Sequence, residues 1–272
     1  MSSEFRVPSC PHPPHPVLST QYSVLGFRYL FADLHIHTVL SPCAEVEMIP
    51  PLIIRRAREL GLGLIGVTDH NSAENVAAVI EAAEGSGVAV LPGMEVQTRE
   101  EVHLVTLFDT AEQALAWQTE VFDHLPYLKN SEDHFGAQFV VDATGEYVRR
   151  NERLLVTSTD LSLESVVARV QALGGLVLPA HVDRPAFSLI ANLGFIPPDL
   201  DLPAMEIFRS SQEAEVRQRF PQIRGFTLVC NGDAHRLNEM MARTMFKIAA
   251  PTVAELVLAL RSERSRWVRV YQ

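Results

Sequence analysis

The chain has 272 residues and a formal net charge of −10, with 47% apolar and 21% charged residues. This length suits one large α/β domain, or two small ones, with a substantial core. The acidic balance argues against a general nucleic-acid binder, whose surface must be basic to displace counterions. It leaves nucleotides open, because bound metal cations would bring positive charge into a single pocket.

Cysteine usage and apolar runs bear on the compartment. Cys10, Cys43 and Cys230 lie far apart and form no CxxC pair, which is typical of a reducing compartment. The apolar runs are too short to cross a bilayer, and prolines interrupt the N-terminal segment where a signal peptide would be apolar. We therefore expect a cytoplasmic protein without membrane contact, in which residues 1–28 form a Pro-rich, disordered extension.

Residues 29–272 are interpreted as one domain in which short apolar strands alternate with amphipathic helices. The predicted elements are, in chain order, strand Phe31–His37, helix Pro50–Leu60, strand Leu64–Thr68, helix Ser72–Glu84, strands Val88–Val96 and Val102–Phe108, helix Ala111–His124, helix Leu163–Leu173, strands Leu176–Ala180 and Ala204–Phe208, helix Gln212–Phe220, strands Thr227–Cys230 and Thr244–Ile248, helix Val253–Arg261 and strand Trp267–Val270. Ser72 and Ser162 are the predicted N-caps. The alternation predicts a parallel sheet covered by helices, and the number of strands favours a barrel.

Residues 126–159 interrupt this alternation. Two apolar runs, Phe139–Val141 and Leu154–Val156, flank turn-forming residues at Asp142–Glu146 and predict a β-hairpin. A long excursion inside a compact domain is often a lid or a specificity loop, and an idle surface hairpin is the alternative.

Histidines and carboxylates recur beside the predicted strands, mostly at their C-terminal ends. His35 and His37 are two residues apart on one strand, so their side chains project from one face and can converge on one ion. The other such residues are Asp69, His70, Glu95, His103, His181, Asp233 and His235. A packed core would not tolerate so many unpaired polar groups, whereas imidazole and carboxylate are natural ligands of Zn, Mn and Fe. In α/β barrels, active sites assemble at this edge.

Five motifs together resemble those of the PHP (polymerase and histidinol phosphatase) family of metal-dependent phosphoesterases. They are Asp33-Leu34-His35-Ile36-His37-Thr38, Thr68-Asp69-His70-Asn71, Gly93-Met94-Glu95, Ala180-His181-Val182-Asp183-Arg184 and Gly232-Asp233-Ala234-His235. A single HxH is a weak signal, whereas five motifs in the family's order are a strong one. The resemblance implies a distorted (β/α)7 barrel with two or three divalent metal ions, Zn, Mn or Fe, at its C-terminal rim.

The resemblance also implies a ligand set for each of three ions: His35, His37, Glu95 and Asp233 for the first, Glu95, His103 and His181 for the second, and His70 and His235 for the third. Many family members add a histidine to the third site, where this chain has Cys43. A thiolate there would favour Zn or Fe over Mn, and the alternatives are a site completed by water or an empty one.

The implied activity is hydrolysis of phosphate esters by a metal-activated hydroxide. The expected substrates are small phosphomonoesters, nucleotides or short oligonucleotide ends, and the acidic balance favours the small ones. Arg184 is the candidate phosphate clamp, with a structural ion pair as the alternative. His235 is expected to assist the leaving group, and Asp69 to orient a neighbouring ligand or cap a helix. We expect residues 126–159 to lie over the rim and to tune substrate choice.

Two other functions remain open. An amidohydrolase also begins with HxH, but it usually bridges its metals through a lysine at a strand end, and Lys129 and Lys247, the only lysines, follow no suitable strand. A catalytically silent metal- or phosphate-binding module is the alternative from a different class, although such a module need not retain nearly every ligand position. The GxGxxG, Walker and GxSxG motifs of dinucleotide, P-loop and serine-nucleophile mechanisms are absent.

Overall fold

The computed structural model describes residues 26–208 and 211–271. The first half contains β1 (Arg28–Ile36), α1 (Pro50–Glu59), β2 (Leu62–Val67), α2 (Val76–Ala82), β3 (Ala89–Gln97), β4 (His103–Leu107), α3 (Ala111–His124), α4 (Glu132–Phe135), β5 (Phe139–Val141) and β6 (Tyr147–Arg150). The second half contains α5 (Leu163–Ala172), β7 (Leu176–Pro179), α6 (Leu189–Leu193), β8 (Ala204–Ile207), α7 (Glu213–Arg219), η1 (Pro221–Ile223), β9 (Thr227–Cys230), η2 (Leu237–Glu239), β10 (Thr244–Ile248), α8 (Val253–Leu260) and β11 (Trp267–Val270). Residues 1–25 of the expected N-terminal extension lie outside the described residues.

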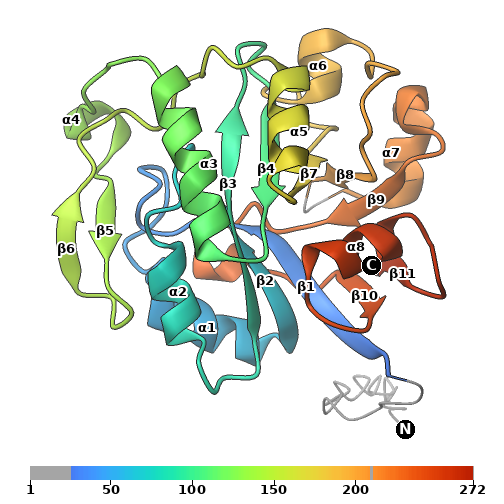
Figure 1. Ribbon diagram of the computed structural model, residues 1–272, viewed down its shortest axis with the longest axis horizontal. Coiled ribbons are helices and arrows are strands. Elements are labelled where there is room, and N and C mark those ends of the chain that lie inside the picture. Colours follow the sequence, from blue (N-terminus) through green and yellow to red (C-terminus); the bar gives the residue numbers. More distant parts are fainter. Residues whose placement is uncertain (1–25, 209–210, 272) are drawn as a thin grey trace, which may run out of the picture.

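A seven-stranded sheet in the order β11-β10-β1-β2-β3-β4-β7 curls through the molecule (Figure 1). β1, β2 and β3 are parallel, whereas β4 lies antiparallel between β3 and β7, and β10 lies antiparallel between β1 and β11. The expectation of a purely parallel sheet is therefore wrong. Thr98 N donates to Val102 O at 3.0 Å, so a tight turn joins β3 to β4. A parallel crossover needs a dozen or more residues, and this connection is too short for one.

A separate parallel pair, β8 and β9, closes the sheet into a barrel. Val182 N donates to Glu206 O at 2.8 Å, which joins the end of β7 to β8. His37 N donates to Ala234 O, and Ala234 N donates to His35 O, both at 3.0 Å, which joins the segment after β9 to β1. The order β1-β2-β3-β4-β7-β8-β9 thus returns to β1, and the expected distorted seven-stranded α/β barrel is confirmed.

Two apolar layers surround these strands. The interior of the barrel is one cluster with side chains from every barrel strand, onto which α8 packs Val253, Leu256 and Leu260. A larger cluster lies between the strands and the covering helices, and Trp117 of α3 is fully buried in it. Because apolar residues and α8 fill one end of the barrel, the polar residues gather at the opposite end.

Outside residues 126–159 the predicted elements agree with the structure in type, and apart from helix Ser72–Glu84 their ends differ by at most three residues. The prediction of Ser162 as an N-cap is confirmed, because its side chain accepts from Ser165 N. The prediction of Ser72 is wrong: α2 begins at Val76 after Asn75. Ser72 Oγ instead bonds to Gln118 Oε1 at 3.0 Å, since the residues after β2 form a loop rather than a helical turn.

Residues 126–159 contain the expected hairpin, with a different second strand. β5 pairs with β6, so the prediction of a strand at Leu154–Val156 is wrong. Leu155 is fully buried in a small apolar cluster with Leu40, Leu125 and Val140, which explains its hydrophobicity by packing rather than by strand pairing. With α4, the hairpin flanks the barrel at the left of Figure 1.

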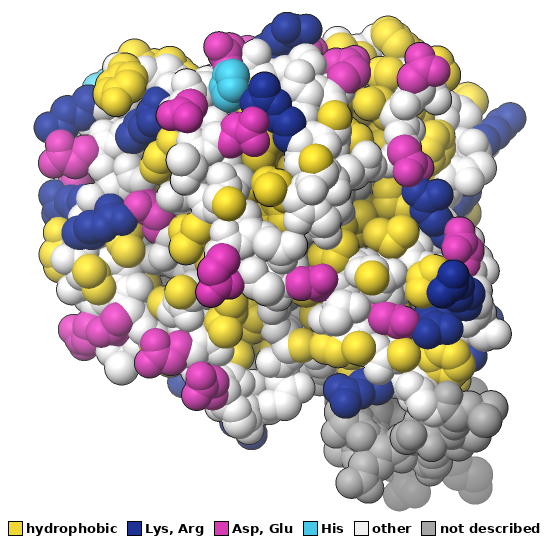
Figure 2. All heavy atoms as spheres, in the orientation of Figure 1, with side chains coloured by type: hydrophobic (Ala, Val, Ile, Leu, Met, Phe, Trp, Pro, Cys, Tyr) yellow, Lys and Arg dark blue, Asp and Glu magenta, His cyan; other side chains and the backbone are white. Residues whose placement is uncertain are grey.

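Over the described residues, no helix combines the length and the apolarity that crossing a bilayer requires. On the face drawn in Figure 2, acidic and basic side chains are mixed. Lys and Arg side chains gather at its lower right, where Figure 1 places β10, β11 and the C-terminus.

Candidate metal centre

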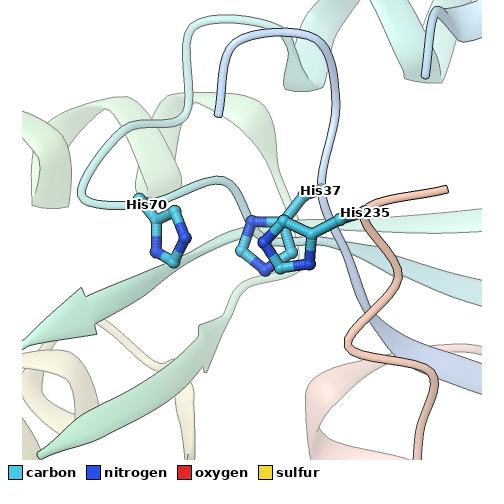
Figure 3. A group of neighbouring side chains, drawn as sticks. All are labelled: His37, His70 and His235. Atoms are coloured by element: carbon cyan, nitrogen blue, oxygen red, sulfur yellow. The ribbon is translucent and has the colours of Figure 1, made fainter. Parts of the chain in front are cut away.

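The structure brings the predicted histidine and carboxylate ligands together at the C-terminal ends of the barrel strands. Their candidate donor atoms lie within 4.8 Å of one another in three groups: His35, His37, Glu95 and Asp233; His70, Glu95 and His103; and His37, His70 and His235. His181 Nε2 lies 3.3 Å from Glu95 Oε1. Figure 3 shows the third group, in which the rings of His37 and His235 stack with centroids 4.0 Å apart.

Several polar residues at the strand ends have a left-handed backbone. Asn71, His181 and Asp233 adopt φ angles of 48°, 29° and 44°. For residues other than Gly, such conformations cost on the order of 1–3 kcal/mol and persist only where the surroundings enforce them. For His181 one such contact is its own N–H, which donates to the buried Glu206 carboxylate at 3.1 Å. The chain therefore bends sharply where it presents these side chains.

In the first group, four acceptor atoms face a common point. His35 Nε2 and His37 Nε2 are 3.1 Å apart, and Asp233 Oδ1 lies 3.5 Å from each. The Glu95 carboxylate approaches His35 Nε2 to 3.3 Å and His37 Nε2 to 3.6 Å. Ligands bound at about 2.0–2.1 Å to a tetrahedral zinc ion lie about 3.3 Å from one another. The observed spacing therefore suits a single bound cation.

The hydrogen bonds on the far sides of the rings determine where their protons lie. His35 Nδ1 lies 3.0 and 3.1 Å from the Glu206 oxygens, which only accept, so Nδ1 carries the proton. His37 Nδ1 lies 2.9 Å from Ser41 Oγ, whose own proton goes to Asp69 at 2.6 Å. When both rings are neutral, their Nε2 atoms thus direct lone pairs at each other and at two carboxylates. Such an arrangement requires a cation or a proton at its centre.

The carboxylates of this group are held in their ionised, metal-binding form. Burial would raise the pKa of Glu95, but the charges of His103 and His35 and the hydrogen bonds from His103 and His181 lower it well below its usual range. Burial likewise opposes ionisation of Asp233, and His35 and His37 lower its pKa below the usual range. Metal binding to these oxygens therefore need not displace a proton near neutral pH.

Glu95 lies between the groups, as a bridging ligand must. Its Oε1 is 2.8 Å from His103 Nδ1 and its Oε2 is 3.0 Å from His70 Nδ1. His103 Nε2 and His181 Nδ1 are buried without a hydrogen-bond partner among the described residues, which is rare for native polar atoms. The resemblance assigns His70 to the third ion alone, whereas the geometry places it within reach of the Glu95 group as well.

Cys43 lies at the mouth of the cluster, beside His70 and His235. The residue is exposed, and its sulfur does not belong to any of the three donor groups. Partial desolvation would raise the pKa of its thiol, but the two imidazoles lower it to about 6. The sulfur is thus close enough to interact electrostatically with both rings, and its role as a metal ligand stays a prediction.

Arg184 occupies the rim of the cluster. Its Nη1 donates to Asp233 Oδ2 at 2.7 Å, and its guanidinium lies 5.2 Å from the centroid of the Phe208 ring. The side chain remains 38% exposed, so other guanidinium donors are open to an anion. Arg184 thus forms the ion pair that was the alternative to a phosphate clamp, and its role as a clamp stays a prediction.

Asp69 is buried away from the converging donor atoms. It accepts hydrogen bonds from Thr38 N and Thr38 Oγ1, both at 2.7 Å, and from Ser41 Oγ. Because Ser41 in turn accepts from His37, Asp69 acts on the cluster through Ser41 and His37. This geometry fits the expected orienting role, whereas a helix cap and a direct contact with substrate do not fit it.

Glu206 is the main site residue that sequence reasoning missed. It is fully buried in β8, where its two oxygens bind His35, and Oε2 also accepts from Asn231 Nδ2 at 2.8 Å. The only signal in the sequence was a single carboxylate inside the apolar strand Ala204–Ile207. Phe187 was also missed: its half-exposed ring stacks on His103 with centroids 4.9 Å apart.

Comparison with known proteins identifies relatives of this chain. The model of the PHP domain family matches residues 33–169, a stretch that includes His35, His37, Glu95 and His103. The 5′-3′ exoribonuclease Rnm of Salmonella typhimurium is 36% identical over 98 residues, which are 32% of this chain and 32% of that protein. Its Escherichia coli counterpart is 34% identical over 80 residues, 28% of this chain and 26% of the other. The matched region thus spans about a third or less of these relatives.

Solved structures share the fold at low sequence identity. The lesion-specific endonuclease PfuEndoQ from Pyrococcus furiosus superposes with a TM-score of 0.67 and 20% identity, covering 88% of this chain and 57% of that one. A metal-dependent phosphoesterase, described as putative, from Bifidobacterium adolescentis superposes with a TM-score of 0.50 and 20% identity, covering 75% of this chain and 87% of that one. At these identities the likeness establishes the fold.

Proposed function

The chain belongs to the PHP domain family, and from this membership and the geometry of the cluster we propose that it is a metal-dependent hydrolase of phosphate esters in nucleic acid. One observation supports this more than any other. Four buried acceptors, His35 Nε2, His37 Nε2 and the carboxylates of Glu95 and Asp233, face one point at spacings that suit a bound cation. A purely structural cluster would pair these acceptors with donors instead.

The named relatives favour nucleic acid over a small phosphomonoester. The curated relatives are 5′-3′ exoribonucleases, and endonuclease Q has been captured with a 27-mer duplex that carries an abasic lesion at its active site. We infer that the phosphodiester near the end of a nucleic-acid strand is the reacting group here. A small phosphomonoester is the second candidate substrate. Only the acidic net charge of the chain favours it.

The residues that would hold the ions are those of the three donor groups, with His181 beside Glu95. Divalent ions bound there would supply Lewis acidity and lower the pKa of a water molecule for attack at phosphorus. The protein side chains do the positioning. Glu206 and Ser41 fix the protons of His35 and His37 on Nδ1, so that their lone pairs point inward.

Two residues at the mouth would act on the substrate in this proposal. Arg184 keeps guanidinium donors exposed beside Asp233, where they can bind phosphoryl oxygens. His235 Nδ1 lies 3.0 Å from the backbone oxygen of Asp233, which only accepts, so Nδ1 bears a proton. The other nitrogen of neutral His235 would bind an ion through its lone pair, whereas only the imidazolium form of His235 would carry a proton there for the leaving oxygen.

The amidohydrolase alternative finds little support in the positions of the lysines. Lys129 Nζ pairs with Glu152 at 3.1 Å on the surface, and Lys247 Nζ lies over the ring of Phe27, 4.5 Å from its centroid. Neither Glu152 nor Phe27 is a member of the three donor groups. Glu95 occupies the position between the groups that a bridging lysine would take.

The decisive experiment reconstitutes the metal-free protein with Mn²⁺, Zn²⁺ or Fe²⁺ and offers it 5′-phosphorylated oligonucleotides and p-nitrophenyl phosphate in parallel. We expect at least two bound ions per chain, and release of nucleotides from the oligonucleotides only in reconstituted protein. Phosphate release from the monoester with intact oligonucleotides would favour the second candidate. Bound ions without turnover on either substrate would favour the silent module.

A further inference from the structure

The outer face of the β1–β10–β11 sheet differs from the rest of the surface. Residues two apart on a strand share a face, and the register sets Trp267 beside Lys247, and Lys247 beside Tyr29. The intervening residues Leu30 and Phe246 point into the barrel core. We call this outer surface the aromatic–basic face, and its members are Tyr29, Phe31, Lys247, Trp267, Arg269 and Tyr271.

Rings and cations contact one another across this face. The Tyr29 and Trp267 rings lie 5.9 Å apart, and the Arg269 guanidinium lies 4.6 Å from the centroid of the Trp267 ring. Tyr29 and Tyr271 are 49% and 40% exposed. Exposed rings with cations beside them form the combination that binds unpaired bases and their phosphates in single-stranded nucleic acid.

The charge of the face contrasts with the acidic chain. Within the described part of the chain, Lys247 and Arg269 form no ion pair with a carboxylate, whereas nearby Arg266 is paired with Glu255 at 2.8 Å. On a protein with a net charge of −10, two unneutralised cations on an aromatic surface create a local site for a polyanion. Net charge describes the whole surface and conceals this site.

Contacts connect the face to the rim of the metal centre. Arg243 Nε donates to Tyr271 O at 2.9 Å, and Arg243 Nη1 donates to Ser211 O at 3.1 Å. Ser211 N donates to Phe208 O at 2.9 Å, and the Phe208 ring lies under the guanidinium of Arg184. Basic and aromatic residues thus follow one another from Arg184 to β11.

We propose that the aromatic–basic face binds the body of a single-stranded nucleic acid whose end lies in the metal centre. Bases stack on Tyr29, Trp267 and Tyr271, and Lys247 and Arg269 bind phosphates. A duplex hides the faces of its bases and would use only the cations, whereas an acidic peptide would gain nothing from the rings. This inference rests on the proposed function, because it extends the substrate of the same site.

The test measures binding of a fluorescein-labelled 20-nucleotide single strand to the full chain by anisotropy, in chelator, so that turnover is not needed. We expect Lys247→Glu/Arg269→Glu to raise the Kd by about tenfold or more and Tyr29→Ala by about fivefold. In the charge variant, the slope of log Kd against log salt concentration should also be smaller by about 0.7 for each phosphate that is no longer bound. The matched control Arg55→Glu/Arg219→Glu makes the same charge change on α1 and α7 and should leave the Kd unchanged.

The outcomes separate this inference from the proposed function. The metal content and the thermal unfolding of the reconstituted variants should equal those of the unmodified protein, which verifies the metal centre and the fold. An unchanged Kd in the face variants, or an equal rise in the Kd of the control, would overturn the inference while leaving the phosphoesterase intact. The inference would also be overturned if polyglutamate displaced the labelled strand as well as an unlabelled strand does and if Tyr29→Ala left the Kd unchanged. That result would favour an acidic protein partner.

Discussion

The metal centre and the insertion at residues 126–159 are neighbours built in opposite ways. In the metal centre, buried side chains hold other buried side chains, as Glu206 holds His35. On the insertion, ion pairs join side chains that remain exposed; Lys129 and Glu152, for example, are 76% and 73% exposed. Tyr127, also on the insertion, is 99% exposed.

This difference has energetic consequences. Exposed ion pairs contribute about 0–1 kcal/mol, because water screens them and long side chains lose entropy on pairing. Buried charges without a partner are costly, so removing one member of the metal centre disturbs every group that depended on it. Substitutions in the centre should therefore change function strongly, and substitutions on the insertion should change only how substrate is selected.

Glu95→Gln tests the centre most severely. The amide keeps the shape of the side chain but removes the charge that lies between His35, His70 and His103. Because substitutions of groups that merely orient metal ligands cost about 10–100-fold, we expect kcat/KM to fall by more than about 100-fold and at least one ion to be lost. Metal content is measured by elemental analysis, and Glu59→Gln, which changes an exposed carboxylate on α1, is the control. Normal turnover in Glu95→Gln would refute the proposed site.

Glu206→Gln tests whether orientation by a buried neighbour matters. The amide nitrogen would face donors, since Glu206 accepts from His35, His181 N and Asn231. We expect metal affinity or turnover to fall by about 10–100-fold. Glu255→Gln removes a carboxylate paired with Arg266 far from the ligands and should leave metal affinity unchanged. Equal metal affinity in both variants would show that Glu206 serves packing alone.

The sequence predicted which donor residues the structure brings together better than it predicted the groups that hold them in place. His35 and His37 were recognisable because a strand places alternate residues on one face, and Glu95 and Asp233 because the motifs resemble the family. Glu206 was not, because nothing in a four-residue strand indicates that its one carboxylate points at a histidine 171 residues away. Contacts at such sequence separation depend on how the barrel closes.

The same limit applied to the fold. The longer helices were predictable from their periodicity, and Ser162 from its capping position, whereas the short helices α4 and α6 were not predicted. The direction of β4 depended on the five-residue turn that joins it to β3. The burial of Leu155 depended on its packing against Leu40, which lies outside the insertion. Local patterns in the sequence specify elements, whereas tertiary contacts decide which strands pair and which apolar runs pack without pairing.

Tyr127→Ser/Tyr147→Ser tests the insertion with little risk to its packing, because the side chains are 99% and 61% exposed. If the insertion tunes substrate choice, the KM for oligonucleotides should rise by about two- to tenfold, as removing one or two stacked rings implies, while metal content stays constant. Kinetics across substrates of different length would measure the effect. Unchanged KM values for every substrate would contradict a role of the insertion in substrate choice and would leave it only the structural role of covering Leu40.

Cys43 should give the smallest effect on turnover and a clear chemical signature. Since His70 and His235 lower its thiol pKa to about 6, its thiolate fraction rises as pH passes about 6, well below the 9.0 of an ordinary thiol. In metal-free protein, iodoacetamide should therefore modify Cys43 fully at pH 7, and the rate should be half-maximal near pH 6. Cys230, whose pKa burial raises to about 12, should stay unmodified.

Peptide mass spectrometry assigns the modified residue, and Cys43→Ser is the matched variant. If the sulfur is a ligand of the third ion, Zn²⁺ should protect Cys43 from alkylation, and Cys43→Ser should bind one ion fewer, because a hydroxyl is a much weaker ligand for zinc than a thiolate. If alkylation proceeds at the same rate with and without Zn²⁺ while Cys43→Ser keeps every ion, the ligand role is wrong. The sulfur would then serve only to adjust the protonation of His70 and His235 at the mouth.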